Sequence, residues 1–228
     1  MPPYVLLEAT RAYVLGSADP SNITSPIGSI TISPSAREIS GRNPERQDHI
    51  IGPNAAPSFA GYFVARFDTD FISWGTANSG IIHADEHVRN DTSLSGYAIF
   101  PLQTKVVNVR IGVSFISVDQ ARINLDTEIP DGVSLETTAY NTRKAWAEKL
   151  DRIQLQGATE ENKTTFYTAF YHTLQVNFAS FAHKMHLTIV MTQYPYEQDE
   201  DGKYYSGYDD TVHEGRSYTG YSIWVCAP

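Results

Sequence analysis

The stretch "HADEH", His83–His87, has the residue types and spacing of a metal-dependent hydrolase. Its order matches the H-x-x-E-H metalloprotease string, in which both histidines bind the metal. That chemistry needs a helix, because only a helix brings the two imidazoles to one face. Here Gly80 precedes the string and Asn90 with Asp91 follows it, between segments typical of strands. We therefore predict a solvated hairpin at this position rather than a metal site.

A second candidate, "EQDEDG", resembles the start of a calcium loop. Its acidic residues Glu197, Asp199 and Asp201 alternate, and Gly202 stands at the sixth position. An EF-hand loop also needs a bidentate glutamate at its twelfth position. That position holds Tyr208. The pattern therefore predicts an acidic turn, and no metal ligands are assigned in this chain.

The C-terminal part of the chain combines aromatic rings with acidic side chains. Tyrosines are frequent from Tyr194 onward, and Asp209, Asp210, His213 and Glu214 are interleaved with them. Flat rings stack on the C–H faces of sugars, while carboxylates accept hydrogen bonds from hydroxyl groups. This composition fits a carbohydrate cleft. It equally fits an aromatic core with a polar rim, so composition alone leaves both readings open.

Bulk properties exclude several classes of protein. The 228 residues carry a net charge of −9, which argues against nucleic-acid partners. No apolar run approaches the roughly 18 residues that span a membrane, and the first residues do not have the pattern of a secretion signal. The single cysteine, Cys226, excludes an internal disulfide framework. We expect a soluble globular protein with no membrane partner.

The first half of the chain has the pattern of antiparallel strands. "YVLLEA", "IGSITIS" and "GYFVARFD" are short β-prone runs separated by turn residues. The clearest strand is 105–117, in which apolar and small or polar residues alternate, and this period predicts a sheet with one buried face. The residues expected on that face are Val107, Val109, Ile111, Val113 and Phe115. These runs favour a β-sandwich.

The second half has helical patterns. Ser117 and Gln120 form a capping box that predicts a helix start. A longer helix is expected from Ser134, with Leu135, Ala139, Thr142, Trp146 and Leu150 on one stripe, and a third over about 159–175, burying Phe166, Phe170 and Leu174. Strands followed by helices predict an α+β chain with segregated domains and a boundary near Ser134.

Several stretches together resemble glycoside hydrolase family 92, the fungal α-mannosidases. They are "NPERQDHIIGP", "GVSFISVDQARINLDTEIPDG", "RKAWAEKLDRI", "FYTAFYHTLQ", "DGKYYSGYDDTVHEG" and "YTGYSIW". The resemblance implies an incomplete antiparallel β-sandwich over 1–133, a linker helix over 134–157, and the first helices of an (α/α)6 toroid over 158–228. It also implies α-mannoside glycans as partners, chiefly the α-1,2 links of N-glycans, hydrolysed with inversion by a site that contains calcium.

The sequence departs from the family pattern in three places. Family members carry more sandwich before "PYVLLEATR", residues 176–193 are extra, and residues 225–228 replace the stretch that continues the toroid. Segments 176–193 and 225–228 both begin with valine, whose codon starts with GT as introns do. Segment 176–193 ends in glutamine, which can be encoded by CAG, a usual intron end. Leu187-Thr188 can be encoded by CTAAC, a common fungal branch point. We hypothesise that both stretches are translated introns.

The resemblance assigns sugar contacts but no catalytic residue. The family's catalytic acid and base follow the segment that matches Trp224, and the aspartate that holds the terminal mannose falls at Val225. Trp224 is expected to stack on the sugar, with Asp209 and His213 as inherited contacts. The readings are an active mannosidase, a mannose-binding sandwich module, and an inert mannosidase fragment, which we favour. We expect this chain not to hold the family's calcium.

The extra segment 176–193 also has a structural expectation. It contains neither proline nor glycine, so the preceding helix is expected to continue through "FASFAHKMHLTIVMT". Such a helix would separate the segment containing Asp209 and Trp224 from the sandwich.

The intron hypothesis is tested on the transcript. We expect amplification across the junction from reverse-transcribed RNA to yield a product that joins Gln175 directly to Tyr194. A single unspliced species would refute the hypothesis.

Overall fold

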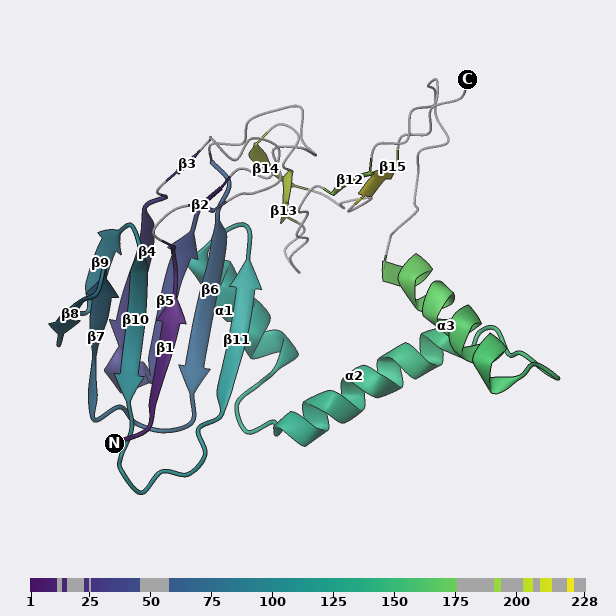
Figure 1. Cartoon of the computed structure of the whole chain (residues 1–228), viewed down its shortest axis with the longest axis horizontal. Coiled ribbons are helices and arrows are strands. Elements are labelled where there is room, and N and C mark those ends of the chain that lie inside the picture. The colour runs from purple at the N-terminus through teal and green to yellow at the C-terminus, as the bar shows by residue number, and fades with distance from the viewer. Residues whose placement is uncertain are drawn as a thin grey trace. The chain divides into compact units, whose positions relative to one another are not determined.

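The computed structural model describes residues 1–11, 14–15, 23–24, 26–45, 58–175, 191–193, 203–206, 210–214 and 221–223. The chain forms two compact units (Figure 1). Unit 1 comprises Met1–Glu128 and Tyr194–Ser217, and unit 2 comprises Ile129–Gln193 and Tyr218–Pro228. Each unit is therefore built from two separate stretches of sequence.

Unit 1 contains the two antiparallel sheets that the sequence predicts. The four-stranded sheet has the order β1-β10-β7-β8, and the five-stranded sheet has the order β11-β6-β5-β4-β9. The bounds are β1 Tyr4–Glu8, β10 Leu94–Ile99, β7 Ser73–Asn78, β8 Ile81–Ala84, β11 Val109–Ser114, β6 Gly61–Phe67, β5 Glu38–Asn43, β4 Gly28–Ser33 and β9 Val88–Asp91. A short 3-10 helix, Pro34–Ala36, joins β4 to β5, and the short strands β2 (Val14–Leu15) and β3 (Ile23–Thr24) pair with each other.

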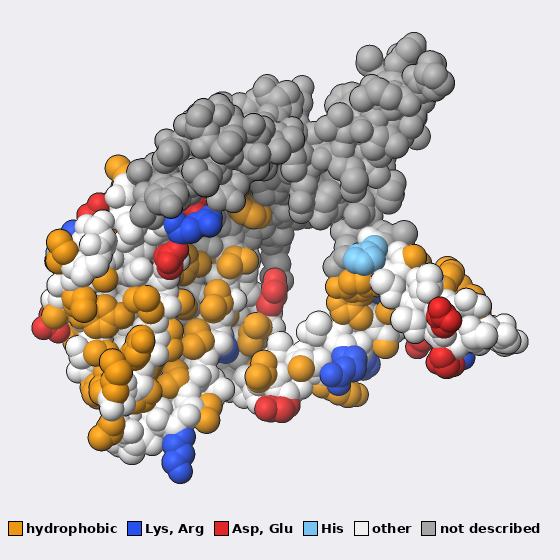
Figure 2. Space-filling view, in the orientation of Figure 1, with side chains coloured by type: hydrophobic (Ala, Val, Ile, Leu, Met, Phe, Trp, Pro, Cys, Tyr) orange, Lys and Arg blue, Asp and Glu red, His pale blue; other side chains and the backbone are white. Residues whose placement is uncertain are grey.

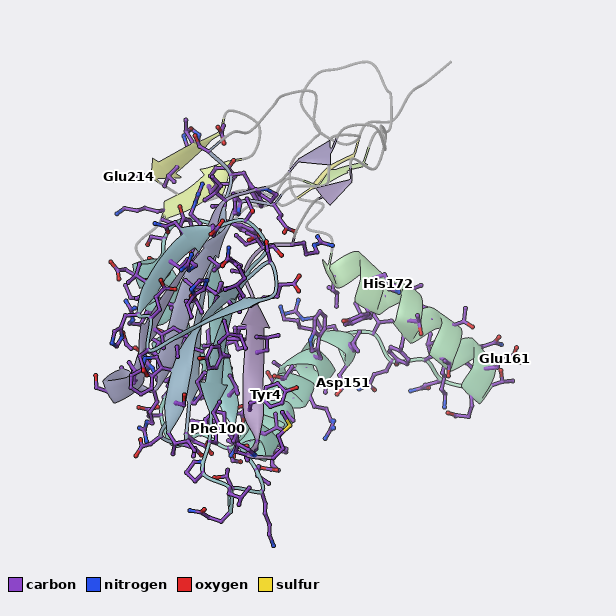
Figure 3. All side chains as sticks on the ribbon, turned by 60° about the vertical axis from the view of Figure 1, so that its left-hand side comes forward. Tyr4, Phe100, Asp151, Glu161, His172 and Glu214 are labelled. Atoms are coloured by element: carbon purple, nitrogen blue, oxygen red, sulfur yellow. The ribbon has the colours of Figure 1, made fainter. Side chains whose placement is uncertain are left out.

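The core lies between the two sheets. Alternate residues of β4 and β10 point inward, so that Ile30, Ile32, Leu94 and Ala98 are at most 1% exposed. Phe100 is fully buried, whereas Tyr4 on the neighbouring strand is 58% exposed (Figure 3). Burying each large aliphatic side chain contributes roughly 1.5–3 kcal/mol. This inward face therefore supplies most of the stability of unit 1.

Three phenylalanines close one end of this core. The ring centroids of Phe67 and Phe71 are 5.2 Å apart, and those of Phe71 and Phe100 are 5.7 Å apart, both in edge-to-face geometry. Phe67 also lies 5.6 Å from Phe100. Edge-to-face pairs add about 0.5–1.5 kcal/mol beyond the buried area.

The predicted buried face of β11 is confirmed only in part. Val107 and Val109 pack against the core. Ile111 and Val113 are 50% and 64% exposed, whereas Gly112 and Ser114 are buried. Helix α1 (Val118–Glu128) covers the glycine face. A Cβ atom at Gly112 would lie 2.2 Å from the Ala121 carbonyl oxygen, so only glycine allows the helix to approach this closely. The prediction is therefore wrong for Ile111 and Val113, because period-2 alternation does not say which of two layers covers a strand.

Ile111 and Val113 nevertheless belong to the inward face of the five-stranded sheet. They pair in register with Ala65 and Phe63, which contact the core. β1 and β11 end their respective sheets. Among the described strands, the four-stranded sheet has one strand fewer, and none of its strands lies beyond β1 to cover this end of the inward face. Figure 2 shows further hydrophobic side chains on the sandwich surface.

The N-terminus of α1 matches half of the predicted capping box. The Gln120 amide N–H donates to Ser117 Oγ over 3.0 Å, as predicted. The side-chain amide of Gln120, however, donates to Asn124 Oδ1. The Ser117 N–H donates instead to Ser114 Oγ, at 3.4 Å. The end of β11 thus supplies the acceptor that the sequence pattern assigned to Gln120.

A nearly buried carboxylate attaches α1 to the five-stranded sheet. The Glu38 side chain is 7% exposed and pairs with Arg122 at 2.8 Å and with Arg66 at 3.1 Å. Arg66 also pairs with Asp126 of α1 at 2.5 Å. Removing one member of such a pair leaves an uncompensated charge, at a cost of about 3–5 kcal/mol when it is buried. The helix is therefore held by both packing and charge.

Unit 2 contains α2 (Leu135–Leu150) and α3 (Glu160–Gln175), which confirms the two longer predicted helices. Ser134 caps α2 by accepting the Thr137 N–H at 3.2 Å. The helices meet where the ring centroids of Trp146 and Tyr171 lie 4.6 Å apart. Helix α2 has no buried residue, and Phe166, Phe170 and Leu174 are half-buried rather than buried. The predicted stripes are thus only partly covered, since each helix has a single helical neighbour in the described part of the unit.

The structure does not continue the third helix to the end of the extra segment. α3 spans Glu160–Gln175, and Met191–Gln193 form strand β12, paired with β15 (Tyr221–Ile223). The expected helix is therefore wrong at 191–192, where β-branched residues nearby in the sequence favour a strand. Residues 176–190 lie outside the described residues.

None of the helices in the described residues is long and apolar enough to cross a membrane.

The open face of β11 generates a prediction about solubility. We expect the double variant I111T/V113T to increase the soluble fraction, because it removes exposed apolar surface beside an unpaired strand edge. Its free energy of unfolding should change by no more than about 0.5 kcal/mol per site. Centrifugation and thermal melting measure the two quantities.

The matched control is I32T, a like substitution at a residue that is 1% exposed on the same sheet. It should destabilise the protein by about 1–3 kcal/mol, since it buries a hydroxyl in the core. A double variant as destabilised as I32T would show that Ile111 and Val113 are covered in solution.

Candidate functional site

The "HADEH" segment connects the two sheets. β8 pairs with β7 of the four-stranded sheet, whereas β9 pairs with β4 of the five-stranded sheet. The predicted hairpin is therefore confirmed only for His83 and Ala84, which belong to the β7–β8 hairpin, whereas residues 85–87 cross between the layers. His83 Nε2 lies 2.7 Å from Asn78 Oδ1, and His87 Nδ1 lies 2.9 Å from the Ile32 carbonyl oxygen. The two imidazoles have different partners and do not form the arrangement that the metalloprotease motif requires.

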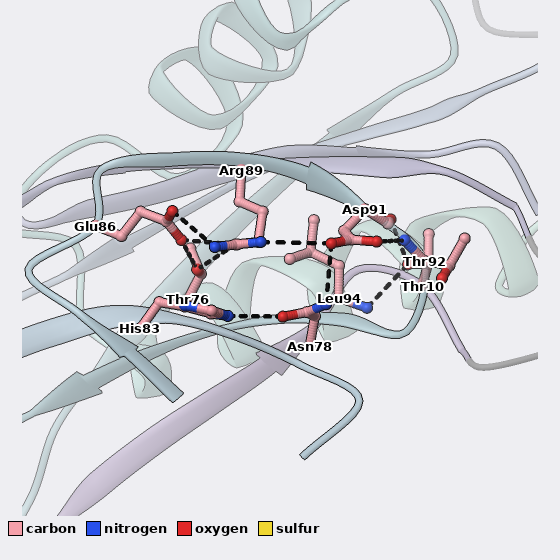
Figure 4. Close-up of polar contacts among 9 residues, drawn as sticks. All are labelled: Thr10, Thr76, Asn78, His83, Glu86, Arg89, Asp91, Thr92 and Leu94. Atoms are coloured by element: carbon pink, nitrogen blue, oxygen red, sulfur yellow. Dashed lines mark hydrogen bonds and ion pairs between the residues drawn. The ribbon is translucent and has the colours of Figure 1, made fainter. Parts of the chain in front are cut away.

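Glu86, the acid of this motif, is engaged by Arg89 and Thr76 (Figure 4). Arg89 Nε donates to one carboxylate oxygen at 2.7 Å and Arg89 Nη2 to the other at 2.9 Å. The Thr76 hydroxyl also donates to Glu86. Arg89 and Thr76 lower the pKa of Glu86 through these hydrogen bonds. A carboxylate with a lowered pKa and a bidentate arginine suits a structural link better than a general base.

The same network continues along β9. Asp91 lies 3.4 Å from Arg89 Nη1 and accepts the Asn78 side-chain amide at 2.9 Å. Thr76 and Asn78 stand on β7, whereas Arg89 and Asp91 stand on β9. The polar groups therefore bind one sheet to the other at this edge of the sandwich.

Metal binding is tested by the chemistry of the ligands present. No group of three or more His, Cys, Asp or Glu side chains that could hold a metal ion occurs in the described part of the chain. Residues 197–202, the "EQDEDG" stretch, lie outside that part. The expectation that this chain does not hold calcium stays a prediction.

A hairpin from the second half of the sequence packs in unit 1. It consists of β13 (Lys203–Ser206) and β14 (Thr211–Glu214), with Tyr205 opposite Val212. Tyr205 is 3% exposed, and its ring centroid lies 6.0 Å from that of Phe59. Phe59 in turn lies 5.6 Å from Phe115, which follows β11. The hairpin is therefore part of the aromatic packing at this side of the sandwich.

Asp210 anchors the hairpin through both carboxylate oxygens. Oδ2 accepts the Ser58 backbone N–H at 2.8 Å, and Oδ1 accepts the Tyr205 hydroxyl at 2.6 Å. Ser58 belongs to the stretch before β6, so the contact joins distant parts of the sequence. The expectation that the extra segment separates this region from the sandwich is wrong for the hairpin, since these contacts form although the segment is present.

Of the three predicted sugar contacts, the structure describes one, His213. His213 lies on β14, opposite Tyr204, and is half-buried, with Nε2 2.9 Å from the Thr211 hydroxyl. Successive strand residues point to opposite faces, so His213 lies on the face opposite to Tyr205. Asp209 and Trp224 lie outside the described residues. The sequence reading did not identify Asp210 as an anchor, although two adjacent aspartates between strand-like runs are a turn signal.

Two family patterns match consecutive parts of the chain. The glycosyl hydrolase family 92 N-terminal domain matches residues 3–114, and the glycosyl hydrolase family 92 catalytic domain matches residues 120–226. The chain belongs to glycosyl hydrolase family 92. This GH92 assignment confirms the family that the sequence motifs indicated.

Solved structures of GH92 enzymes share the fold. An inverting mannosidase from Bacteroides thetaiotaomicron VPI-5482 is 27% identical, with a TM-score of 0.67 over 96% of this chain and 25% of that chain. A family GH92 α-mannosidase from Bacteroides thetaiotaomicron is 20% identical, with a TM-score of 0.63 over 87% of this chain and 24% of that chain. The chain therefore spans about a quarter of the length of these solved relatives.

A relative is also found by sequence. An uncharacterized secreted glycosidase of Arthroderma benhamiae is 37% identical over 71 residues, which are 30% of this chain and 9% of that protein. The match is short. The relative's name states that it is a glycosidase, which agrees with the GH92 assignment.

The Glu86 network predicts a pH-dependent contribution to stability. The pKa of Glu86 is lowered in the folded state, so its contribution is complete above the unfolded pKa of about 4.3 and is lost as the pH falls through the folded value. We expect E86Q to melt at a lower temperature than the wild type at pH 7. The difference should shrink as the pH falls below the unfolded pKa of about 4.3, because the unfolded chain then takes up a proton that the folded carboxylate resists.

Melting curves between pH 7 and pH 3 measure the difference. E128Q is the matched control, because Glu128 ends α1 and does not link the sheets. A difference that stays constant over this range would mean that the charge of Glu86 does not contribute to stability.

Proposed function

We propose that this chain recognises α-mannosides at the face of the β13–β14 hairpin that carries His213, as part of the GH92 mannosidase reaction. The observation that carries the proposal is the attachment of the hairpin to the sandwich through Asp210. The hairpin lies within the stretch that resembles the entrance of the family's sugar site. The solved relatives named as mannosidases support mannose-containing glycans as the substrate class.

The residues proposed for the sugar have complementary chemistry. The Trp224 ring offers a flat surface for the C–H face of a pyranose, and Asp209 accepts hydrogen bonds from sugar hydroxyls. The His213 imidazole adds a donor or an acceptor, depending on its tautomer. We further propose that the bound sugar is an α-1,2-linked mannose at the non-reducing end of an N-glycan.

Hydrolysis with inversion needs two more carboxyl groups. One protonates the leaving oxygen and the other activates water, at a separation of about 6.5–9.5 Å. The family resemblance places both after the segment that ends at Trp224. We therefore propose that residues 1–224 contribute binding of the α-mannoside to this reaction and not the two catalytic carboxyl groups.

Calcium is not proposed to take part in binding by this chain. The described residues offer no ligand cluster, and the loop pattern at 197–202 lacks its glutamate at the twelfth position. The alternative function is a mannose-binding module formed by the sandwich alone. The anchored hairpin favours recognition that uses segments from both halves of the chain.

The proposal predicts binding without turnover. We expect titration calorimetry with α-1,2-mannobiose to show saturable binding that a chelator leaves unchanged, and a mannose-release assay to show no product. W224A should weaken binding about tenfold, because a lost stacking contact contributes roughly 1–1.5 kcal/mol. H213A should weaken it several-fold.

Y140A is the matched control, since Tyr140 is a 62% exposed aromatic residue on α2. An equal loss in Y140A and W224A would contradict a specific platform at Trp224. Turnover that a chelator abolishes would contradict binding without catalysis and would favour a complete active mannosidase.

A further inference from the structure

Asp210 stands where its carboxylate contacts both the hairpin and the sandwich. It stands between β13 and β14 with φ of 58°, in the left-handed region that aspartate tolerates better than most residues. This conformation turns the chain back into β14. The same residue sends its carboxylate toward the sandwich, where the Ser58 N–H donates to it.

The two hydrogen bonds of Asp210 come from different parts of the chain. The Tyr205 hydroxyl bond, at 2.6 Å, lies within the hairpin and fixes the direction of the carboxylate. The Ser58 bond, at 2.8 Å, joins residues 152 positions apart and fixes the hairpin on the sandwich. Hydrogen bonds to an ionised acceptor are roughly twice as strong as neutral ones. Because it joins the hairpin to a distant part of the chain, the Ser58 bond attaches the hairpin to the sandwich.

Aromatic packing alone would leave the hairpin's orientation less defined. Tyr205, Phe59 and Phe115 provide apolar contact, but tilted ring pairs tolerate small rotations and shifts. A hydrogen bond from a backbone amide has a narrow preferred direction. The combination buries Tyr205 and leaves the orientation of the opposite face, with His213, dependent on Asp210.

We infer that Asp210 is a positioning residue, whose carboxylate holds the β13–β14 hairpin so that the face carrying His213 is presented to the mannoside. The inference rests on the proposed function. Both oxygens of Asp210 accept hydrogen bonds from the protein, one from the hairpin and one from Ser58, and this pair of contacts assigns it to holding the hairpin. Its influence on binding therefore acts through the residues that it places.

The test compares D210A, D210N and Y205F in the full chain. Hydrogen exchange of the hairpin amides 203–214 reports anchoring, and calorimetric titration with α-1,2-mannobiose reports presentation to the sugar. We expect D210A to speed exchange of these amides about tenfold and to weaken binding about tenfold, while the core strands β4 and β10 keep their protection.

The conservative variants separate charge from shape. D210N keeps one carbonyl oxygen, so we expect its effects to be smaller than those of D210A. Y205F keeps the packed ring and removes only the intra-hairpin bond, so exchange should rise by about threefold. D70A is the matched control, because Asp70 is an aspartate of the sandwich whose side chain is 89% exposed, and it should change neither measurement.

The outcomes distinguish the inference from the proposed function. Unchanged hairpin exchange in D210A would overturn the anchoring role. Faster exchange with unchanged mannobiose affinity would overturn the positioning role. A wild-type protein that does not bind mannobiose would overturn the proposed function, and with it the presentation to sugar, while the exchange result still decides whether Asp210 anchors the hairpin.

Discussion

The close approach of α1 to β11 over Gly112 is the contact on which the arrangement of unit 1 depends. A side chain at this position would collide with the Ala121 carbonyl and with Leu125, so glycine allows the helix to lie directly on the strand. The short link between strand and helix then fixes Phe115, which packs on Phe59. Phe59 in turn packs on Tyr205 of the hairpin. A backbone contact at Gly112 thus contributes, through these three rings, to the packing of a hairpin far along the sequence.

The sequence predicted those features that local chemistry determines. Strands β1, β4 and β6 follow from short β-prone runs between turn residues, and Ser134 caps a helix because its hydroxyl accepts an N–H within the same turn. The sequence did not predict which face of β11 is covered at Gly112 and Val113. Helix α1 packs on the face that carries Gly112, and Val113 on the other face is exposed. Alternation states that two faces differ. Only tertiary packing decides what covers each face.

The same limit explains the candidate sites. "HADEH" had the order of a catalytic motif, yet its two histidines have separate partners because the segment crosses from one sheet to the other. Its glutamate and Arg89 instead join β9 to Thr76 of β7. Asp210 shows the reverse case, since a turn residue acquires its role from Ser58, which no local pattern connects with it. Contacts between side chains of different layers depend on the topology of the fold, so the spacing of residues along the chain does not predict them.

Chain length between Ser58 and Asp210 matters less than their contact geometry. The entropic cost of closing a flexible loop grows only as the logarithm of its length, by about 0.6 kcal/mol for each doubling. An extra stretch such as 176–193 therefore weakens the attachment of the hairpin by far less than the loss of one charged hydrogen bond, about 1.5–3 kcal/mol. Whether that stretch is translated and whether the hairpin reaches the sandwich are consequently separate questions. The aromatic contacts of Tyr205 and the hydrogen bonds of Asp210 stabilise the attachment of the hairpin to the sandwich. This holds whether or not residues 176–193 are translated.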